Sequence, residues 1–303
     1  MINEARDRIM ETGDILFGKY RVERLLGKGG SGFVYLCTNI ELGNKWALKY
    51  VPSAGSTVRY PAEVEILKKL YHVSLPRIVD VFSDEEGLYI VESNIEGTDL
   101  ESLLRHHGGF EAERVVEWSL ELCDILEYLH EFKPRPIIYR DLKPSNIMLT
   151  RGNRLVLIDF GISKEYSSFQ PKDACIAGTE LYAAPEQLIR GGLTDRRTDI
   201  YNLGATLYQL LHGRVQQTEG NSSVSGKDRA VSRLDRLIAR CMENRPEDRY
   251  QSIEDIRPEL LLVKNMLAVE GVKKRIIFRL EAALIVILSI ISYSIAFLGI
   301  VDR

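Results

Sequence analysis

Residues 139–146 read Tyr-Arg-Asp-Leu-Lys-Pro-Ser-Asn, and this stretch decides how the rest of the chain is interpreted. It brings a carboxylate (Asp141), a lysine (Lys143) and an amide (Asn146) together within six positions, after a helical pattern and before the apolar residues 147–149. Phosphoryl transfer needs an acceptor for a hydroxyl proton, a positive charge near the moving phosphoryl group and oxygen ligands for Mg²⁺. Asp141, Lys143 and Asn146 can supply these in that order, so we interpret the stretch as a catalytic loop.

A second carboxylate follows where an apolar run ends. Asp159-Phe160-Gly161 comes directly after the apolar residues 155–158, and Asp159 lies 18 positions beyond Asp141. Short matches of this kind also occur in ordinary turns. The spacing from Asp141 favours the other interpretation, in which Asp159 is a second metal ligand.

Glycines recur near the N-terminus in the pattern G-x-G-x-x-G-x-V at residues 27–34. Their missing side chains allow backbone amides to approach phosphate oxygens closely. A Rossmann dinucleotide site would need a helix directly after the glycines, whereas the strand-like residues 34–36 follow here; an ordinary glycine-rich hairpin is a further alternative. The predicted nucleotide contacts from this loop are Gly27, Lys28, Gly29, Gly30, Ser31, Gly32 and Val34.

Lys49 lies in the apolar strand pattern 46–49, where an unpaired ammonium group would be costly. Glu63, on the helix predicted next, is the candidate partner. In isolation, a surface lysine on an edge strand would be the simpler interpretation. The other motifs favour the pair.

Hydrophobic periodicity divides the chain into two parts. Short alternating runs predict antiparallel strands over 20–50, 78–82 and 88–91, with one helix over 62–70 between them. After Gly97, apolar residues spaced by three and four predict a long amphipathic helix through Val115, Trp118, Leu122, Leu126 and Leu129. A small strand-rich lobe and a larger helical lobe would leave a cleft between them, which is a common place for a ligand.

Further motifs occur in a fixed order: residues 178–186 (GTELYAAPE), residues 199–204 (DIYNLG) and Arg249. With these, the chain resembles the eukaryotic-type protein kinase family, and in particular bacterial membrane-anchored serine/threonine kinases, over about residues 20–262. The resemblance implies an α+β fold with a β-rich N-lobe (about 18–96) that carries one main helix, and a mainly α-helical C-lobe (about 97–264). An N-terminal extension, 1–17, would precede it.

The resemblance also implies transfer of the γ-phosphoryl group of ATP, with Mg²⁺ or alternatively Mn²⁺, to Ser/Thr hydroxyls of proteins, including the chain itself. The implied catalytic residues are Asp141, Lys143 and Lys49. Adenine would lie between Val34, Ala47 and Met148; Lys49 with Glu63 would hold the phosphates; Asn146 and Asp159 would ligate the metal. Lys143 and Thr179 follow the Ser/Thr pattern, and Thr179 would help to dock the substrate.

The remaining implied roles are structural or regulatory. Glu186 and Arg249 would form a buried ion pair, and Asp199 would brace the catalytic loop. Arg140 suggests control by phosphorylation of the activation loop, because a phosphate pairs readily with arginine. The candidate sites are Ser163, Ser167, Ser168 and Thr179.

Two positions depart from the family pattern. Tyr139 replaces the usual histidine, and we expect it to pack against Phe160 without loss of activity. Glu92 stands where the family commonly has an apolar residue at the back of the adenine pocket. A carboxylate there needs a partner or a raised pKa.

Residues 282–301 carry no charge over about 20 positions, which is enough for a helix to cross roughly 30 Å of hydrocarbon. A buried core helix is the alternative. The preceding segment, 265–281, contains Lys273, Lys274, Arg275 and Arg279, so the positive-inside rule predicts a single-pass cell-membrane protein with a cytoplasmic catalytic part. The bilayer would be a partner, and signals would arrive through a homodimer or a membrane partner.

Composition excludes several other classes. The net charge of −3 gives no basic footprint, so no nucleic-acid partner is expected. The four cysteines show no C-x-x-C spacing, which disfavours a zinc site or a disulfide scaffold and favours a reducing cytosol. Three rival functions are a pseudokinase, a small-molecule kinase of related fold and a purely structural membrane protein.

Overall fold

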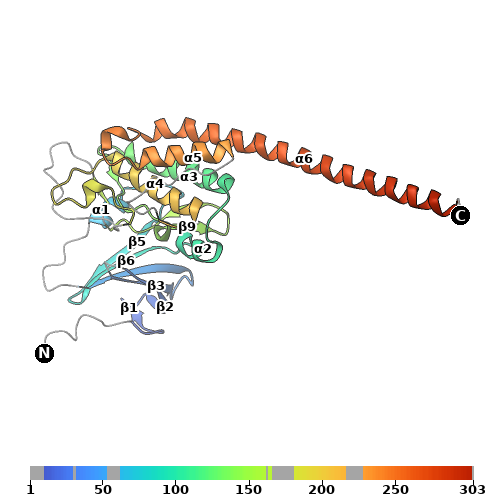
Figure 1. Cartoon of the computed structure of the whole chain (residues 1–303). Coiled ribbons are helices and arrows are strands. Elements are labelled where there is room, and N and C mark those ends of the chain that lie inside the picture. Colours follow the sequence, from blue (N-terminus) through green and yellow to red (C-terminus); the bar gives the residue numbers. More distant parts are fainter. Residues whose placement is uncertain are drawn as a thin grey trace, which may run out of the picture.

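The computed structural model of the chain describes residues 10–29, 32–52, 62–161, 163–165, 181–215 and 228–301, with the side chains of residues 62–63, 164–165 and 290–301 outside that description. A strand-rich N-terminal lobe packs against a larger helical lobe, and one helix runs out of the second lobe (Figure 1). The predicted two-lobed α+β architecture is therefore confirmed.

The N-terminal lobe is built on a six-stranded antiparallel sheet in the order β1-β2-β3-β4-β6-β5. Its strands are β1 (Ile15–Leu16), β2 (Tyr20–Gly29), β3 (Gly32–Asn39), β4 (Lys45–Pro52), β5 (Ile78–Ser83) and β6 (Gly87–Ser93). Along β3, the side chains of Phe33, Tyr35 and Cys37 are buried in an aromatic-rich core, whereas Val34 between them is only half-buried. This period of two turns Val34 toward the opposite face of the sheet.

Gly32 is required where the turn between β2 and β3 crosses β4. Its φ is +147°, and a Cβ atom there would lie 1.9 Å from the Tyr50 carbonyl oxygen. Neither the backbone conformation nor the space accepts a side chain. The glycine pattern at this position is thus a packing requirement.

The N-lobe helix is shorter than predicted. Helix α1 spans Ala62–Leu67, whereas the apolar pattern predicted a helix to Leu70. After Leu67 the backbone bonds tighten to i→i+3, from Lys69 N to Ile66 O (3.0 Å) and from Leu70 N to Leu67 O (3.2 Å). Helices often finish with such a turn, and Leu70 is buried by it all the same.

The described part of the C-terminal lobe contains the remaining helices and two short sheets. Its helices are α2 (Leu100–His107), α3 (Ala112–His130), α4 (Arg196–His212), α5 (Arg229–Cys241) and α6 (Ile253–Val301), with 3-10 turns η2 (Pro144–Asn146), η3 (Pro185–Gln187) and η4 (Pro246–Asp248). Its strands are β7 (Gly97–Asp99), β9 (Ile147–Thr150) and β10 (Leu155–Leu157) in one sheet, and β8 (Ile137–Ile138) with β11 (Lys164–Glu165) in another.

The two central helices of this lobe, α3 and α4, follow from their sequences. All five apolar residues that predicted α3 are buried in the main core, which confirms that helix. Helix α4 begins at an Asp195 cap, whose carboxylate accepts the Arg197 N–H at 2.8 Å, and it ends at Gly213 in the left-handed conformation. Most of α4 is buried, so the residues that it carries are held rigidly beneath the cleft.

Helix α6 begins in the C-lobe core and then leaves it. Its buried residues recur at alternating steps of three and four and pack on α3 and α5; they are Ile253, Ile256, Leu260, Val263 and Leu267. Arg257 forms ion pairs with Asp124 (2.6 Å) and Glu127 on α3. Figure 1 shows the rest of α6 extending away from the body, without a break at the predicted domain end, residue 264.

The structure does not confirm the predicted membrane span. Within the described part of the chain, no helix combines the length and the apolar character needed to cross a membrane. The backbone of residues 282–301 belongs to α6, but the side chains of residues 290–301 lie outside the described part. The span therefore stays a prediction.

Candidate active site

A cavity of about 640 Å³ lies between the two lobes. Its lining includes most of the predicted nucleotide and metal contacts, which are Gly27, Lys28, Gly32, Val34, Ala47, Lys49, Asn146, Met148 and Asp159. Gly29 pairs with Gly32 at the end of the β2–β3 hairpin. The end of β6 and the residues after it add Ser93, Asn94 and Ile95 to the lining.

Strand register explains why the lining residues of the N-lobe face the same way. Val34 on β3 pairs with Lys49 on β4, and Ala47 on β4 pairs with Glu92 on β6. Directly paired residues of antiparallel strands project to the same face of a sheet. Glu92 therefore lies beside Ala47 on the cleft face and lines the cavity, as the sequence predicted for the back of the pocket.

Lys49 joins the two lobes across the cleft. Its Nζ lies 2.9 Å from Asp159 Oδ1, and its side chain is only 6% exposed. Asp159 has a left-handed backbone (φ +62°), and the same Oδ1 accepts the Gly161 N–H at 3.2 Å. Burial by itself would raise the pKa of Asp159, but the charge and hydrogen bond of Lys49 outweigh it and the pKa is lowered. Asp159 is thus held as a carboxylate.

The catalytic loop holds its polar groups in contact with one another. Lys143 Nζ lies 2.8 Å from Asp141 Oδ2, and Asn146 Nδ2 donates to the same oxygen at 2.8 Å and to the Asp141 carbonyl at 3.0 Å. Burial raises the pKa of Asp141, and the hydrogen bond and charge of Lys143 oppose that rise. A carboxylate with a raised pKa is a stronger base, which suits a group that accepts a hydroxyl proton.

The oxygen atoms of two residues in the cleft fit the ligands of a divalent cation. Asp159 offers carboxylate oxygens, and Asn146 offers its amide oxygen because its nitrogen donates to Asp141. Both residues line the cavity, and oxygen ligands of this kind are those that Mg²⁺ takes together with water and phosphate oxygens. Glu63 belongs to α1, but its side chain lies outside the described residues, as do Gly30 and Ser31 entirely.

Asp199 on α4 braces the catalytic loop from below. It is fully buried, and it accepts the N–H groups of Tyr139 (2.9 Å) and Arg140 (2.7 Å) as well as the His130 ring nitrogen Nε2 (2.8 Å). The brace agrees with the role expected for Asp199. His130 was not singled out by sequence reasoning, because a histidine at the end of an amphipathic helix gives no local sign of its distant partner.

Tyr139, one of the two positions that depart from the family pattern, is accommodated by packing. The Tyr139 and Phe160 rings meet edge to face with centroids 5.0 Å apart, and the Tyr139 hydroxyl donates to the Ile158 carbonyl. The position therefore accepts an aromatic ring, as predicted. Ser163 is 3% exposed and its Oγ donates to the Tyr139 carbonyl at 3.0 Å, so in this conformation it is unsuited to be a phosphorylation site. Ser167, Ser168 and Thr179 lie outside the described residues.

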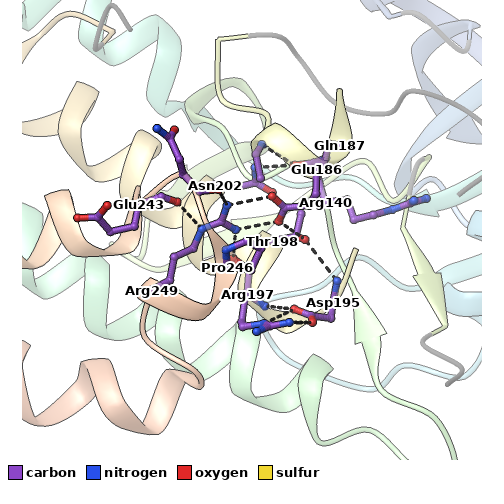
Figure 2. A network of polar contacts seen from close by, with 12 residues as sticks. Arg140, Glu186, Gln187, Asp195, Arg197, Thr198, Asn202, Glu243, Pro246 and Arg249 are labelled. Atoms are coloured by element: carbon purple, nitrogen blue, oxygen red, sulfur yellow. Dashed lines mark hydrogen bonds and ion pairs between the residues drawn. The ribbon is translucent and has the colours of Figure 1, made fainter. Parts of the chain in front are cut away.

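A network of ion pairs and hydrogen bonds anchors the segment around Glu186 to the C-lobe (Figure 2). The buried Arg249 guanidinium donates to both Glu186 oxygens, at 2.8 and 2.9 Å, as expected for this pair. Thr198 donates to the same carboxylate at 2.8 Å. Gln187, which sequence reasoning missed, connects this network to the Arg140 carbonyl; its only sign in the sequence is that it follows Glu186.

Comparison with known proteins agrees with this geometry. The family model described as the protein kinase domain matches residues 20–279. The chain is 28% identical to the serine/threonine-protein kinase PknB of Mycobacterium tuberculosis, over 84% of the chain and 44% of PknB. It is 32% identical to the serine/threonine-protein kinase Pkn1 of Myxococcus xanthus, over 85% of the chain and 39% of Pkn1.

A probable serine/threonine-protein kinase of Clostridium acetobutylicum is 29% identical, over 84% of the chain and 41% of the relative. The chain thus aligns with less than half the length of these curated relatives. Because the family match covers most of the chain, the chain belongs to the eukaryotic-type protein kinase family.

Proposed function

We propose that the chain is an active serine/threonine protein kinase that transfers the γ-phosphoryl group of ATP to hydroxyls of proteins, its own included. One convergence carries this proposal: Lys49 and Asp159 line the interlobe cavity and contact each other, and Asp141 accepts a hydrogen bond from Asn146 of the same lining. These residues come from a strand, a loop and a strand end that are far apart in sequence. A binding module that performs no transfer would have no need of a buried base beside a lysine.

Each residue has a task that its surroundings permit. Lys49 binds phosphate oxygens, because its ammonium group is buried on the cleft face and already faces an anionic oxygen. Asp141 orients the substrate hydroxyl and accepts its proton, while Lys143 supplies positive charge next to that carboxylate. Asn146 and Asp159 would hold Mg²⁺, or alternatively Mn²⁺, which when bound neutralises phosphate charge.

Two observations favour a protein substrate over a small molecule. The segment around Glu186 is fixed to the C-lobe by Arg249 and Thr198, which suits a platform for an extended peptide. The names of the relatives specify serine/threonine-protein kinases, and Lys143 follows the corresponding pattern. A small-molecule kinase has no use for such an anchored segment.

The test is transfer of radiolabelled phosphate from ATP and Mg²⁺ by the purified full chain, to itself and to a generic protein. Asp141→Asn should lower the rate by about 10²-fold or more, because the base and positioner is lost. Asp248→Asn is the matched control, since Asp248 is exposed on η4 away from the cleft. Labelling that persists undiminished in Asp141→Asn would contradict the proposal.

We also propose that residues 282–301 insert into the cell membrane and leave the catalytic lobes on the cytoplasmic side. The uncharged sequence supports this, as do the basic residues that precede it. Large apolar side chains on α6 are more than half exposed where the helix has left the lobe, among them Phe278, Leu284 and Leu288. A bilayer would cover them.

A further inference from the structure

Arg140 has a backbone conformation that its side chain disfavours. Its φ is +67°, in the left-handed region that residues other than glycine rarely adopt. Such a conformation persists only where the surrounding structure holds it. Because Asp141 is the next residue, whatever holds Arg140 also sets the direction in which the chain presents the Asp141 carboxylate.

Two side chains form hydrogen bonds with the peptide groups on either side of Arg140. The Arg140 N–H donates to Asp199 Oδ1 at 2.7 Å, and the Arg140 carbonyl accepts from Gln187 Nε2 at 2.8 Å. That carbonyl belongs to the peptide group whose nitrogen is that of Asp141. Gln187 is therefore bonded to the backbone unit that directly carries the proposed base.

The other end of the Gln187 amide is fixed to the docking segment, which we define as residues 181–187. Gln187 is 2% exposed, and its Oε1 accepts the Ala184 N–H (3.0 Å) and Asn202 Nδ2 (2.9 Å). Asn202 Nδ2 also donates to the Tyr182 carbonyl at 2.7 Å. Since the oxygen faces two N–H donors, the amide cannot rotate by half a turn without opposing donors to donors.

The docking segment is itself joined to the C-lobe by polar contacts (Figure 2). Glu186, the neighbour of Gln187, is held by Arg249 and by Thr198 of α4. One amide thus ties a segment anchored in the C-lobe to the catalytic loop, across 47 positions of sequence. Buried polar contacts of this kind specify one arrangement of the groups that they join.

We propose that Gln187 is a positioning residue that keeps the docking segment in register with Asp141, so that the hydroxyl of a docked protein meets the carboxylate. This inference rests on the proposed kinase function. Among the described residues, Gln187 is not part of the cavity lining, and it acts through its hydrogen bond to the Arg140 carbonyl. A water molecule that attacks ATP does not use the docking segment, so Gln187 matters for transfer to protein and not for hydrolysis.

The experiment compares the two reactions in one preparation of the full chain. Gln187→Glu keeps the shape and the acceptor oxygen but replaces the donor to Arg140 with a second oxygen. We expect phosphate transfer to a protein substrate to fall by about 10- to 100-fold, since small misplacements of reacting groups have effects of that size. Hydrolysis of ATP by water and the KM for ATP should change far less. The ratio of transfer to hydrolysis does not depend on how much of the enzyme is folded.

Ser119→Ala is the matched control, because it removes a buried hydrogen bond within α3, from Ser119 Oγ to the Val115 carbonyl (2.6 Å), outside the docking segment and the catalytic loop. It should lower the Tm and leave the ratio unchanged. If Gln187→Glu does not fold, Gln187→Met is measured in the same way, because it removes the donor without adding a charge. If Gln187→Glu leaves the ratio of transfer to hydrolysis unchanged, the positioning role of Gln187 is overturned and the proposed kinase function is not. A parent chain that phosphorylates no protein overturns the proposed function and this inference with it.

Discussion

Lys49 and Asp159 are 110 positions apart in sequence, yet the Lys49 ammonium nitrogen lies 2.9 Å from a carboxylate oxygen of Asp159. The contact joins a strand of the N-lobe to the end of a C-lobe strand, and both residues line the interlobe cavity. It fixes the positive and negative groups of the site at one place. The consequences for activity can be measured directly.

Lys49→Met should lower phosphate transfer by about 10²-fold or more, because the phosphates lose a preorganised positive charge in a buried site. The rate should be measured at saturating ATP, together with the KM for ATP. Lys68→Met is the control, since Lys68 is exposed and its ion pair with Glu65 (3.5 Å) lies at the surface. A Lys49→Met enzyme as active as the control would show that this ammonium group has no part in transfer.

Arg249→Leu should destabilise the chain by about 3–5 kcal/mol, because it leaves the Glu186 charge nearly buried without its partner. Urea unfolding of the full chain measures the change in free energy of unfolding. Arg245→Leu, four residues earlier, removes an exposed arginine and should cost about 0–1 kcal/mol. Equal unfolding midpoints for the two variants would contradict the structural role of the Glu186–Arg249 pair.

The pH dependence of transfer should report the ionisation of Asp141, which must be deprotonated to accept a proton. Burial raises the pKa of Asp141, and Lys143 opposes that rise. Lys143→Met removes the opposition, so the pKa rises further and the acid-side fall of kcat should move to higher pH. Profiles of kcat against pH compare this variant with Lys264→Met on the exposed side of α6. An acid limb that stays in place, or moves to lower pH, contradicts the coupling.

Membrane insertion should depend on the uncharged character of residues 282–301. The full chain should stay with cell membranes after alkaline carbonate extraction, whereas Leu288→Arg should be released in larger part, because a charge in the span costs about 2.5–3.5 kcal/mol. Arg279→Lys keeps the charge of the preceding segment and serves as the control. If carbonate releases the parent chain fully, the anchor is excluded.

Local sequence was sufficient for the parts of the site that lie in contiguous motifs. Asp141, Lys143 and Asn146 share one loop, and β4 and α3 follow from their own periodicity, so the places of these residues and elements could be predicted. Contacts between distant segments were predicted only through the family resemblance, as for Glu186 with Arg249, or were not predicted at all. The contacts of Gln187 with the Arg140 carbonyl and of His130 with Asp199 depend on how α4 packs beneath the loop, which no local pattern reveals.

The sequence also did not reveal how deeply individual side chains are buried. Ser163 has the residue type of a phosphorylation site, but its hydroxyl is enclosed beside Tyr139. The end of α1 also depended on context, because the apolar pattern continues to Leu70 while the backbone tightens after Leu67. In both cases tertiary packing decided what a short segment could do.

The uninterrupted course of α6 has a mechanical consequence. Its first turns pack on α3 and α5. At about 1.5 Å per residue, its 49 residues reach some 70 Å. The described backbone is helical over this whole length, with Pro258 inside its first turns. A tilt of the far end of α6 would therefore be transmitted to the C-lobe through the contacts of α6 with α3 and α5.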